Sequence, residues 1–191
     1  MLAACTIKMR LTTTLLTLTL FSCSTNKDTN PKNDFQTYLR SLDKLETPLT
    51  FDTKRNEIQV LSQNYDTTLF KIFKHAWSMG PHGKIFENDS IVVLVDISPG
   101  DVVVPLLTTF NQHGQKLDSL NPWIKSGGDI GYESYEFLTI NDKKEIIVID
   151  STTTWDLNED EDDTIEGTEK LTVDTVTYKI DKKGKIIKTR G

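Results

Sequence analysis

Apolar residues at helical spacing begin the first folded part of the chain. They recur at intervals of three or four positions, which is the period of one helix face: Phe35, Tyr38, Leu39, Leu42 and Leu45. Asn33 or Asp34 can cap the start of this segment, and Pro48 can stop it. The pattern therefore predicts an amphipathic helix of about three turns that packs on a sheet.

A second helix is predicted to begin at Asp66. Its apolar face would consist of six residues: Leu69, Phe70, Ile72, Phe73, Ala76 and Trp77. The stretch FKIF at 70–73 alternates equally well as a strand, so both interpretations stay open. Gly80, Pro81 and Gly83 follow and should end the segment in a turn.

From Lys84 onward the pattern favours strands. The run SIVVLVDIS (90–98) is rich in β-branched residues and is followed by the turn residues Pro99 and Gly100. The next run, DVVVPLLTTF, contains Pro105. This residue indicates an edge strand or a bulge, because proline cannot donate a hydrogen bond to a neighbouring strand.

Three later stretches share a turn pattern and predict hairpins. Each places Asn or Asp after an apolar residue and before a short polar tip, where these side chains can bond to the backbone. The stretches are FNQHGQK from Phe110, INDKKEI from Ile140 and IDKKGKI from Ile180.

Together these elements predict one mainly β (α+β) domain over residues 34–191. Strands joined by hairpins form an antiparallel meander sheet, with one or two N-terminal helices packed on it. Within the sheet, Ile147 and Ile149 should pair with Val173 and Thr175. Which face is buried stays open, because a register slip of one residue reverses it.

Residues 1–22 have the features of a signal peptide. A short basic start at Arg10 precedes an uncharged run rich in Leu and Thr, from 11 to 21. A membrane-spanning helix needs about 20 apolar residues, so this run is too short to be one. Export from the cytoplasm is therefore expected.

The end of that run, LFSC at 20–23, resembles the lipobox of bacterial lipoproteins. The resemblance implies cleavage before Cys23 and lipidation of this residue, with 23–33 as a flexible tether. It also implies a cell-envelope protein that is anchored to a membrane, with the outer membrane expected, through its acyl chains. Because Cys5 would be removed and Cys23 acylated, the mature chain would contain no disulfide.

The charge of the chain is concentrated in one run. The sequence has 28 acidic and 22 basic residues, and removal of Lys8 and Arg10 with the signal peptide would leave 20 basic ones. The run 156–169 contains eight acids and no base, so the remaining 20 acids balance the 20 bases. No basic face is left to bind phosphates, which argues against a nucleic-acid partner.

No combination of residues predicts a catalytic centre. His75, His82 and His113 match no zinc spacing, and no G-x-S-x-G motif occurs. The stretch SGGDIGY at 126–132 lies outside the strand–turn–helix context of a phosphate-binding loop, and is interpreted as a plain loop. We expect no enzyme, and a pair of carboxylates would be the remaining route to one.

Aromatic residues gather around this Gly-rich segment: Trp123, Tyr132, Tyr135 and Phe137. Trp123, Tyr132 and Tyr135 are candidates for a ligand platform, because aromatic rings offer a large contact area to a sugar or a peptide. The alternative is that these rings plug the end of the sheet.

The acidic run can be aligned with a twelve-position calcium loop. Five residues would fall on ligand positions: Asn158, Asp160, Asp162, Thr164 and Glu169. The alignment departs from the pattern at Asp163, where glycine normally allows a sharp turn. Calcium is therefore a candidate cofactor, and the alternative is a solvated hairpin tip.

The sequence thus predicts a membrane-anchored envelope lipoprotein that acts as a binding module. Its ligand would be a small molecule, a glycan or a protein. The alternative is a structural or assembly subunit of a larger envelope complex.

Overall fold

The computed structural model describes residues 31–55, 62–98 and 102–190. The expected signal peptide, Cys23 and most of the expected tether lie outside these ranges. The described residues form two helices and ten strands: α1 (Pro31–Ser41), β1 (Leu49–Asp52), α2 (Thr67–Phe73), β2 (Gly80–Glu87), β3 (Ile91–Ile97), β4 (Pro105–Asn111), β5 (Lys116–Leu120), β6 (Gly127–Asp129), β7 (Tyr132–Ile140), β8 (Glu145–Thr154), β9 (Lys170–Ile180) and β10 (Ile186–Arg190).

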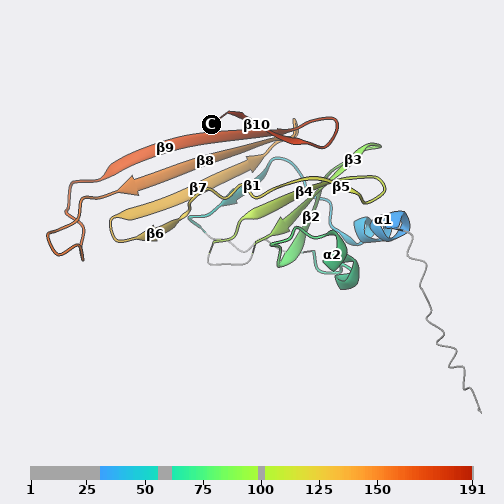
Figure 1. Cartoon of the computed structure of the whole chain (residues 1–191), viewed down its shortest axis with the longest axis horizontal. Coiled ribbons are helices and arrows are strands. Elements are labelled where there is room, and N and C mark those ends of the chain that lie inside the picture. Colours follow the sequence, from blue (N-terminus) through green and yellow to red (C-terminus); the bar gives the residue numbers. More distant parts are fainter. Residues whose placement is uncertain (1–30, 56–61, 99–101, 191) are drawn as a thin grey trace, which may run out of the picture.

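The strands form two sheets (Figure 1). The large sheet has the order β1-β7-β8-β9-β10 with β6 paired to β7, and the small sheet has the order β2-β3-β4-β5. All pairs between these strands are antiparallel. The predicted mainly β fold with N-terminal helices is confirmed. The strands divide between two packed sheets, whereas the pattern predicted a single meander.

The main hydrophobic core lies between the two sheets. Side chains alternate across a strand, so each sheet buries every second residue against the other sheet. The small sheet contributes mainly the β3 residues Ile91, Val93, Val95 and Ile97. The large sheet contributes Leu138, Ile140, Ile146 and Val148 from β7 and β8.

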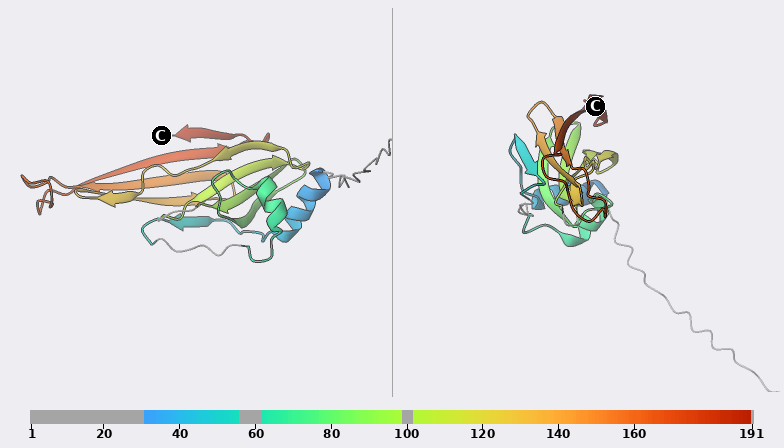
Figure 2. Two further views of the ribbon diagram at one scale, coloured as in Figure 1. Left: turned by 60° about the horizontal axis from the view of Figure 1, so that its bottom comes forward. Right: turned by 90° about the vertical axis from the view of Figure 1, so that its left-hand side faces the viewer.

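Both helices pack on the other face of the small sheet, as Figure 2 shows. Val92 and Leu94 of β3 and Phe110 of β4 meet apolar side chains of the helices: Phe35, Tyr38, Leu39, Phe70 and Phe73. The domain therefore has three layers, and β3 in the middle layer is buried on both faces.

The first helix begins at Pro31, three residues before the expected domain boundary at Asp34. Proline is favoured in the first turn of a helix because its missing N–H needs no partner there. The helix ends at Ser41, before the predicted stop at Pro48. Neither of the two described helices is long and apolar enough to cross a membrane.

The second helix is confirmed, with Asp66 accepting two backbone N–H groups of its first turn. It ends at Phe73, so the predicted continuation to Trp77 is wrong. The N–H of His75 is donated at 2.6 Å to the buried carboxylate of Asp96 instead of to a helix carbonyl.

At two strands, predictions that were based on glycine and proline are wrong. The stretch Gly80–Gly83 starts β2 and does not form the predicted turn. The pairing of β2 with β3 shifts register between Pro81 and Gly83 and again between Lys84 and Phe86. Pro105 is the first residue of β4, which lies inside the small sheet. The predicted edge strand or bulge is wrong here, because proline is tolerated at the first position of a strand.

The three predicted hairpin turns are confirmed. In each turn one side chain accepts the N–H groups of the residues two and four positions later, at 2.8–3.0 Å: Asn111, Asn141 and Asp181. Ile149 lies opposite Thr175, whereas Ile147 lies opposite Thr177 and not Val173. The segment 126–132, expected to be a loop, contains β6 and the tight turn that joins it to β7.

Candidate functional site

The inner face of the large sheet changes from apolar to polar away from the main core. On β7 and β8 the positions that continue the core-facing rows carry four polar side chains, each at most 6% exposed: Ser134, Glu136, Asp150 and Thr152. Buried polar groups need hydrogen-bond partners. Another segment of the chain must therefore cover these side chains and provide such partners.

The segment 121–126 between β5 and β6 is that cover. One oxygen of Glu136, Oε1, accepts the backbone N–H groups of Ile124, Lys125 and Ser126 at 2.8, 2.7 and 3.1 Å. Three bonds from a carboxylate are charge-assisted and stronger than bonds between neutral groups. Glu136 therefore fixes the segment over the inner face.

Asp150 is the centre of the second polar group. Its Oδ1 accepts the hydroxyl of Ser134 at 2.6 Å, and its Oδ2 accepts that of Thr152 at 3.3 Å. The Lys125 ammonium lies 3.0 Å from the same Oδ2. This hydrogen bond to Asp150 raises the pKa of Lys125, so the cation is held at the rim of a nearly inaccessible carboxylate.

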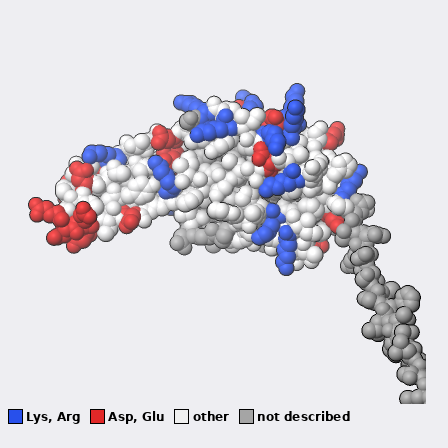
Figure 3. All heavy atoms as spheres, in the orientation of Figure 1, with Lys and Arg blue, Asp and Glu red and all other residues white. Residues whose placement is uncertain are grey.

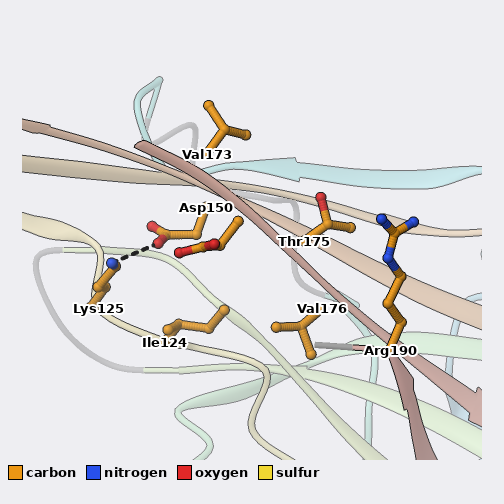
Figure 4. A pocket seen from close by; sticks show the side chains of 8 residues that line it. Ile124, Lys125, Asp150, Val173, Thr175, Val176 and Arg190 are labelled. Carbon is orange, nitrogen blue, oxygen red and sulfur yellow. Dashed lines mark ion pairs between the residues drawn. The ribbon is translucent and has the colours of Figure 1, made fainter. Parts of the chain in front are cut away.

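A cavity of about 580 Å³ opens beside this ion pair (Figure 4). It lies between the 121–126 segment, β8, β9 and the end of β10, and eight residues line it: Ile124, Lys125, Asp150, Val173, Asp174, Thr175, Val176 and Arg190. Asp150 and Asp174 are direct neighbours across the β8–β9 ladder. Among the described residues, neither Asp174 nor Arg190 has a side-chain ion pair.

The structure does not bring the three candidate platform residues together. Tyr132 and Tyr135 lie three positions apart on β7 and therefore point to opposite faces of the sheet. The Tyr132 hydroxyl donates to the carbonyl of Lys125 on the inner side at 3.1 Å. Tyr135 instead lies under the ammonium of Lys54. Trp123 is about half exposed in the covering segment.

The acidic run lies at the end of the molecule farthest from α1, as the red surface in Figure 3 shows. Asn158 Oδ1 accepts the N–H groups of Asp162 and Asp163 at 3.1 and 3.4 Å, and its Nδ2 donates to the Asp162 carboxylate at 2.7 Å. The left-handed residue of this turn is Glu161, with φ 56°. Asn158 thus stabilises a turn, as the corresponding residues do in the other hairpins.

Of the five candidate calcium ligands, the structure brings Asn158 and Asp162 into contact. No group of three or more His, Cys, Asp or Glu side chains in the described part of the chain is placed to hold a metal ion. Calcium binding stays a prediction, which the luminescence of terbium sensitised by the nearby Trp155 would test.

The three histidines lie in separate places. His75 and His82 are buried, and His113 lies at a hairpin tip. Burial lowers the pKa of His75, and its Nδ1 accepts the N–H of Trp77 at 3.3 Å. The ring of His82 lies 5.8 Å from that of Phe51.

The residues around the cavity were not identified from the sequence. Asp150 and Glu136 lie on strands that were predicted, and each continues a row of core residues with a carboxylate. A charged residue in a core-facing row was the signal that could have marked them. No protein-family model, curated protein or solved structure matches this chain.

Proposed function

We propose that this protein is a lipid-anchored envelope protein that binds a small charged ligand in the cavity beside the Lys125–Asp150 ion pair. The observation that carries the proposal is the distribution of charge in the cavity wall. The charge of Asp150 is already balanced by Lys125, and two hydroxyl groups donate hydrogen bonds to its oxygens. Asp174 and Arg190 are left to pair with groups from outside.

Asp174 faces the inner side of the large sheet and Arg190, opposite Thr177, faces the outer side, but both line the same cavity. An acid and a base in one cavity favour a ligand that carries both charges. An amino acid or a short peptide offers an ammonium group for Asp174 and a carboxylate for Arg190. Arginine is well suited to carboxylates because its planar guanidinium presents two parallel donors. A cavity of this size falls in the range of small-molecule sites.

The lipid anchor rests on the LFSC motif that ends at Cys23. Helix α1 begins eight residues later at Pro31 and lies at one end of the long axis, with the acidic run at the other (Figure 1). An anchor at Cys23 would therefore hold the helical end close to a membrane and leave the acidic end directed away from it.

The binding proposal can be tested with a panel of free amino acids, dipeptides and neutral sugars, scored by the shift in the melting temperature of the protein. We expect a shift from some amino acids or dipeptides and none from the sugars. Asp174→Asn and Arg190→Gln should each weaken binding of an active compound about tenfold, the effect of losing one charged contact. Asp142→Asn and Lys182→Gln, two exposed hairpin-tip variants, are matched controls. A panel without any shift, or affinities that the two cavity variants leave unchanged, would contradict the proposal.

One observation favours an assembly subunit as a second candidate. The outer face of the large sheet exposes several apolar side chains: Phe137, Ile149, Leu171, Val173 and Ile187. Exposed apolar surface of this kind is typical of docking surfaces. Recovery of a stoichiometric partner with the membrane-extracted protein would support this candidate over the first.

A further inference from the structure

The first half of β9 is an open sheet edge. β9 pairs with β8 along its whole length, but β10 covers only Thr177–Ile180 on its other side. No strand in the described ranges lies beside 170–176 on that side. Residues 170–174 are also exposed on both faces of the sheet. Unpaired backbone N–H and C=O groups along such an edge form a template for another strand.

This edge lacks proline and a bulge, and no described strand covers it, although it carries two charged side chains, Lys170 and Asp174. Proteins protect edges with proline, bulges or a covering segment, but 170–176 contains no proline and its pairing with β8 runs without a register shift. Its outward side chains Leu171 and Val173 are 68% and 55% exposed. Burying apolar surface of this extent would favour association.

We propose that two copies of this chain associate through antiparallel pairing of their β9 edges. The pair would be related by a two-fold axis perpendicular to the joined sheet, the commonest symmetry of protein dimers. Such an axis places the inner faces of the two large sheets on the same side of the joined sheet. Residues directly opposite each other in an antiparallel pair point to the same face, and side chains alternate along each strand. The axis must therefore pass through a residue position and not between two residues.

The side chains select one of these registers. With the axis at Thr172, Lys170 of each copy lies opposite Asp174 of the other copy, and Leu171 lies opposite Val173. Opposite charges and apolar pairs across strands are both stabilising, and the two threonines at the axis are also a favourable pair. An axis at Asp174 would instead place two carboxylates opposite each other. An axis at Val173 would leave Lys170 opposite Val176.

Charge also matches at the ends of the paired segment. The chain that precedes Lys170 in one copy would meet the end of β10 in the other, where Lys188 and Arg190 lie. That chain is the acidic run, with eight acids and no base, and Figure 3 shows the acidic cluster at one end of the molecule, with lysine and arginine side chains spread over the rest. Complementary potentials of this kind favour association in one orientation.

The contacts that Lys170 and Asp174 make in the single chain are compatible with the dimer. Lys170 lies 3.1 Å from Asp156 in the single chain, but both side chains are exposed, and exposed ion pairs contribute little. Asp174 lines the ligand cavity, and a carboxylate has two oxygens with room for several donors. The second copy would add Lys170 as a further wall of that cavity.

The register can be tested by disulfide cross-linking of the full-length protein in detergent. Thr172→Cys places two thiols opposite each other at the axis, within the Cα separation that a disulfide spans. We expect a covalent dimer on a non-reducing gel. Thr175→Cys is the matched control on the same strand. In this register Thr175 of each copy lies opposite Glu169 of the other copy, so the two introduced thiols are too far apart to form a disulfide. Absence of a Thr172→Cys dimer above the background of the parent chain, or equal cross-linking at both positions, would overturn the proposal.

Charge reversal tests the pairing independently of the fold. In the Thr172→Cys background, Lys170→Asp or Asp174→Lys alone should lower the dimer yield several-fold, because like charges then face each other at both ends. The double variant with both exchanges should restore it. Asp142→Lys and Lys182→Asp, at exposed turns away from the edge, should leave the yield unchanged. Failure of the double exchange to restore the dimer would contradict this register, whatever the single variants do.

Discussion

Gly114 and Gly167 share a backbone conformation and differ in their surroundings. Both have φ near +80°, the left-handed region that side chains disfavour. A Cβ on Gly114 would lie 2.8 Å from Cβ of Phe35 and 3.2 Å from the ring of Phe73, whereas a Cβ on Gly167 would meet nothing within 4 Å. The β4–β5 turn therefore needs glycine for conformation and for contact with the helix layer.

The two glycines allow backbone strain to be separated from packing. Gly167→Ala should lower the free energy of unfolding by about 1 kcal/mol, the cost of a left-handed residue. Gly114→Ala should lower it by about 3 kcal/mol, because the new methyl group also overpacks the core around Phe35. Urea unfolding of both variants gives the comparison. Equal losses would show that the turn moves away from α1 at little cost.

Asp96 is the most perturbed carboxyl group in the described chain. It lies on the helix-facing side of β3, 2% exposed, and burial raises its pKa to about 7, although the bonds from His75 and Ser78 act in the opposite direction. Its Oδ1 and the hydroxyls of Tyr38 and Thr108 on the same buried face have no hydrogen-bond partner among the described residues.

The raised pKa of Asp96 predicts a loss of stability as pH rises. In the unfolded chain the carboxyl ionises near its ordinary value of 3.8, and in the folded chain near 7. Folding is therefore penalised increasingly from pH 4 to pH 7, by a total on the order of 4 kcal/mol. Asp96→Asn keeps an acceptor for the N–H of His75 and removes the ionisation. Urea unfolding at pH 4.5 and 7.5 should show that the free energy of unfolding of the variant, relative to that of the wild type, is higher at pH 7.5 than at pH 4.5. A difference that stays constant over this range would contradict the assignment.

At the level of elements, Glu136 joins a strand to a segment that has no regular structure. Its carboxylate accepts three consecutive N–H groups of the 121–126 segment, and its own N–H is donated to the hydroxyl of Thr53 at 2.7 Å. The side chain of this β7 residue thus positions the cover of the cavity, and its backbone contacts the chain that follows β1.

Removing the Glu136 side chain should release this cover. Glu136→Ala leaves three N–H groups without their acceptor, and we expect a loss of about 3 kcal/mol in the free energy of unfolding. Hydrogen exchange should accelerate at the amides of Ile124–Ser126 and not in β3. Glu133→Ala, on the outer face of the same strand, is the control. Unchanged protection of these three amides would show that other contacts hold the segment.

The elements that were predicted from sequence are those set by local patterns. Asn111, Asn141 and Asp181 marked their hairpins because each side chain bonds to a backbone only two and four residues away. The strand at Gly80–Gly83 was missed because its neighbour β3, not its own residues, determines its conformation. The role of Glu136 could not be predicted for a related reason. Its partners become neighbours only when β7 and the 121–126 segment fold together.

At the scale of the whole molecule, the helices and the polar features lie at different ends. α1 and α2 cover the small sheet at the end where the described chain begins, and the large sheet extends away from them toward the acidic run (Figure 2). The cavity and the open edge of β9 belong to this extension. An anchor at the N-terminal end would leave both accessible.

The proposed anchor depends on one residue. Cys23→Ser removes the acylation site, and we expect the protein to leave the membrane pellet after a carbonate wash, since the acyl chains are the proposed membrane anchor. Cys5→Ser is the control, because Cys5 lies in the segment that cleavage would remove, and it should leave the distribution unchanged. Continued recovery of the Cys23 variant in the washed pellet would sink the lipoprotein proposal.

The double burial of β3 has a consequence for how the domain melts. Val93 and Val95 belong to the core between the sheets, while Val92 and Leu94 belong to the core under the helices. The two cores share the backbone of β3. Loss of the helices therefore exposes one face of the strand that also forms the core between the sheets, and separation of the sheets exposes the other face of the strand on which the helices pack. Neither core can survive as a separate cooperative unit. Calorimetry should therefore record one transition, with equal calorimetric and van't Hoff enthalpies.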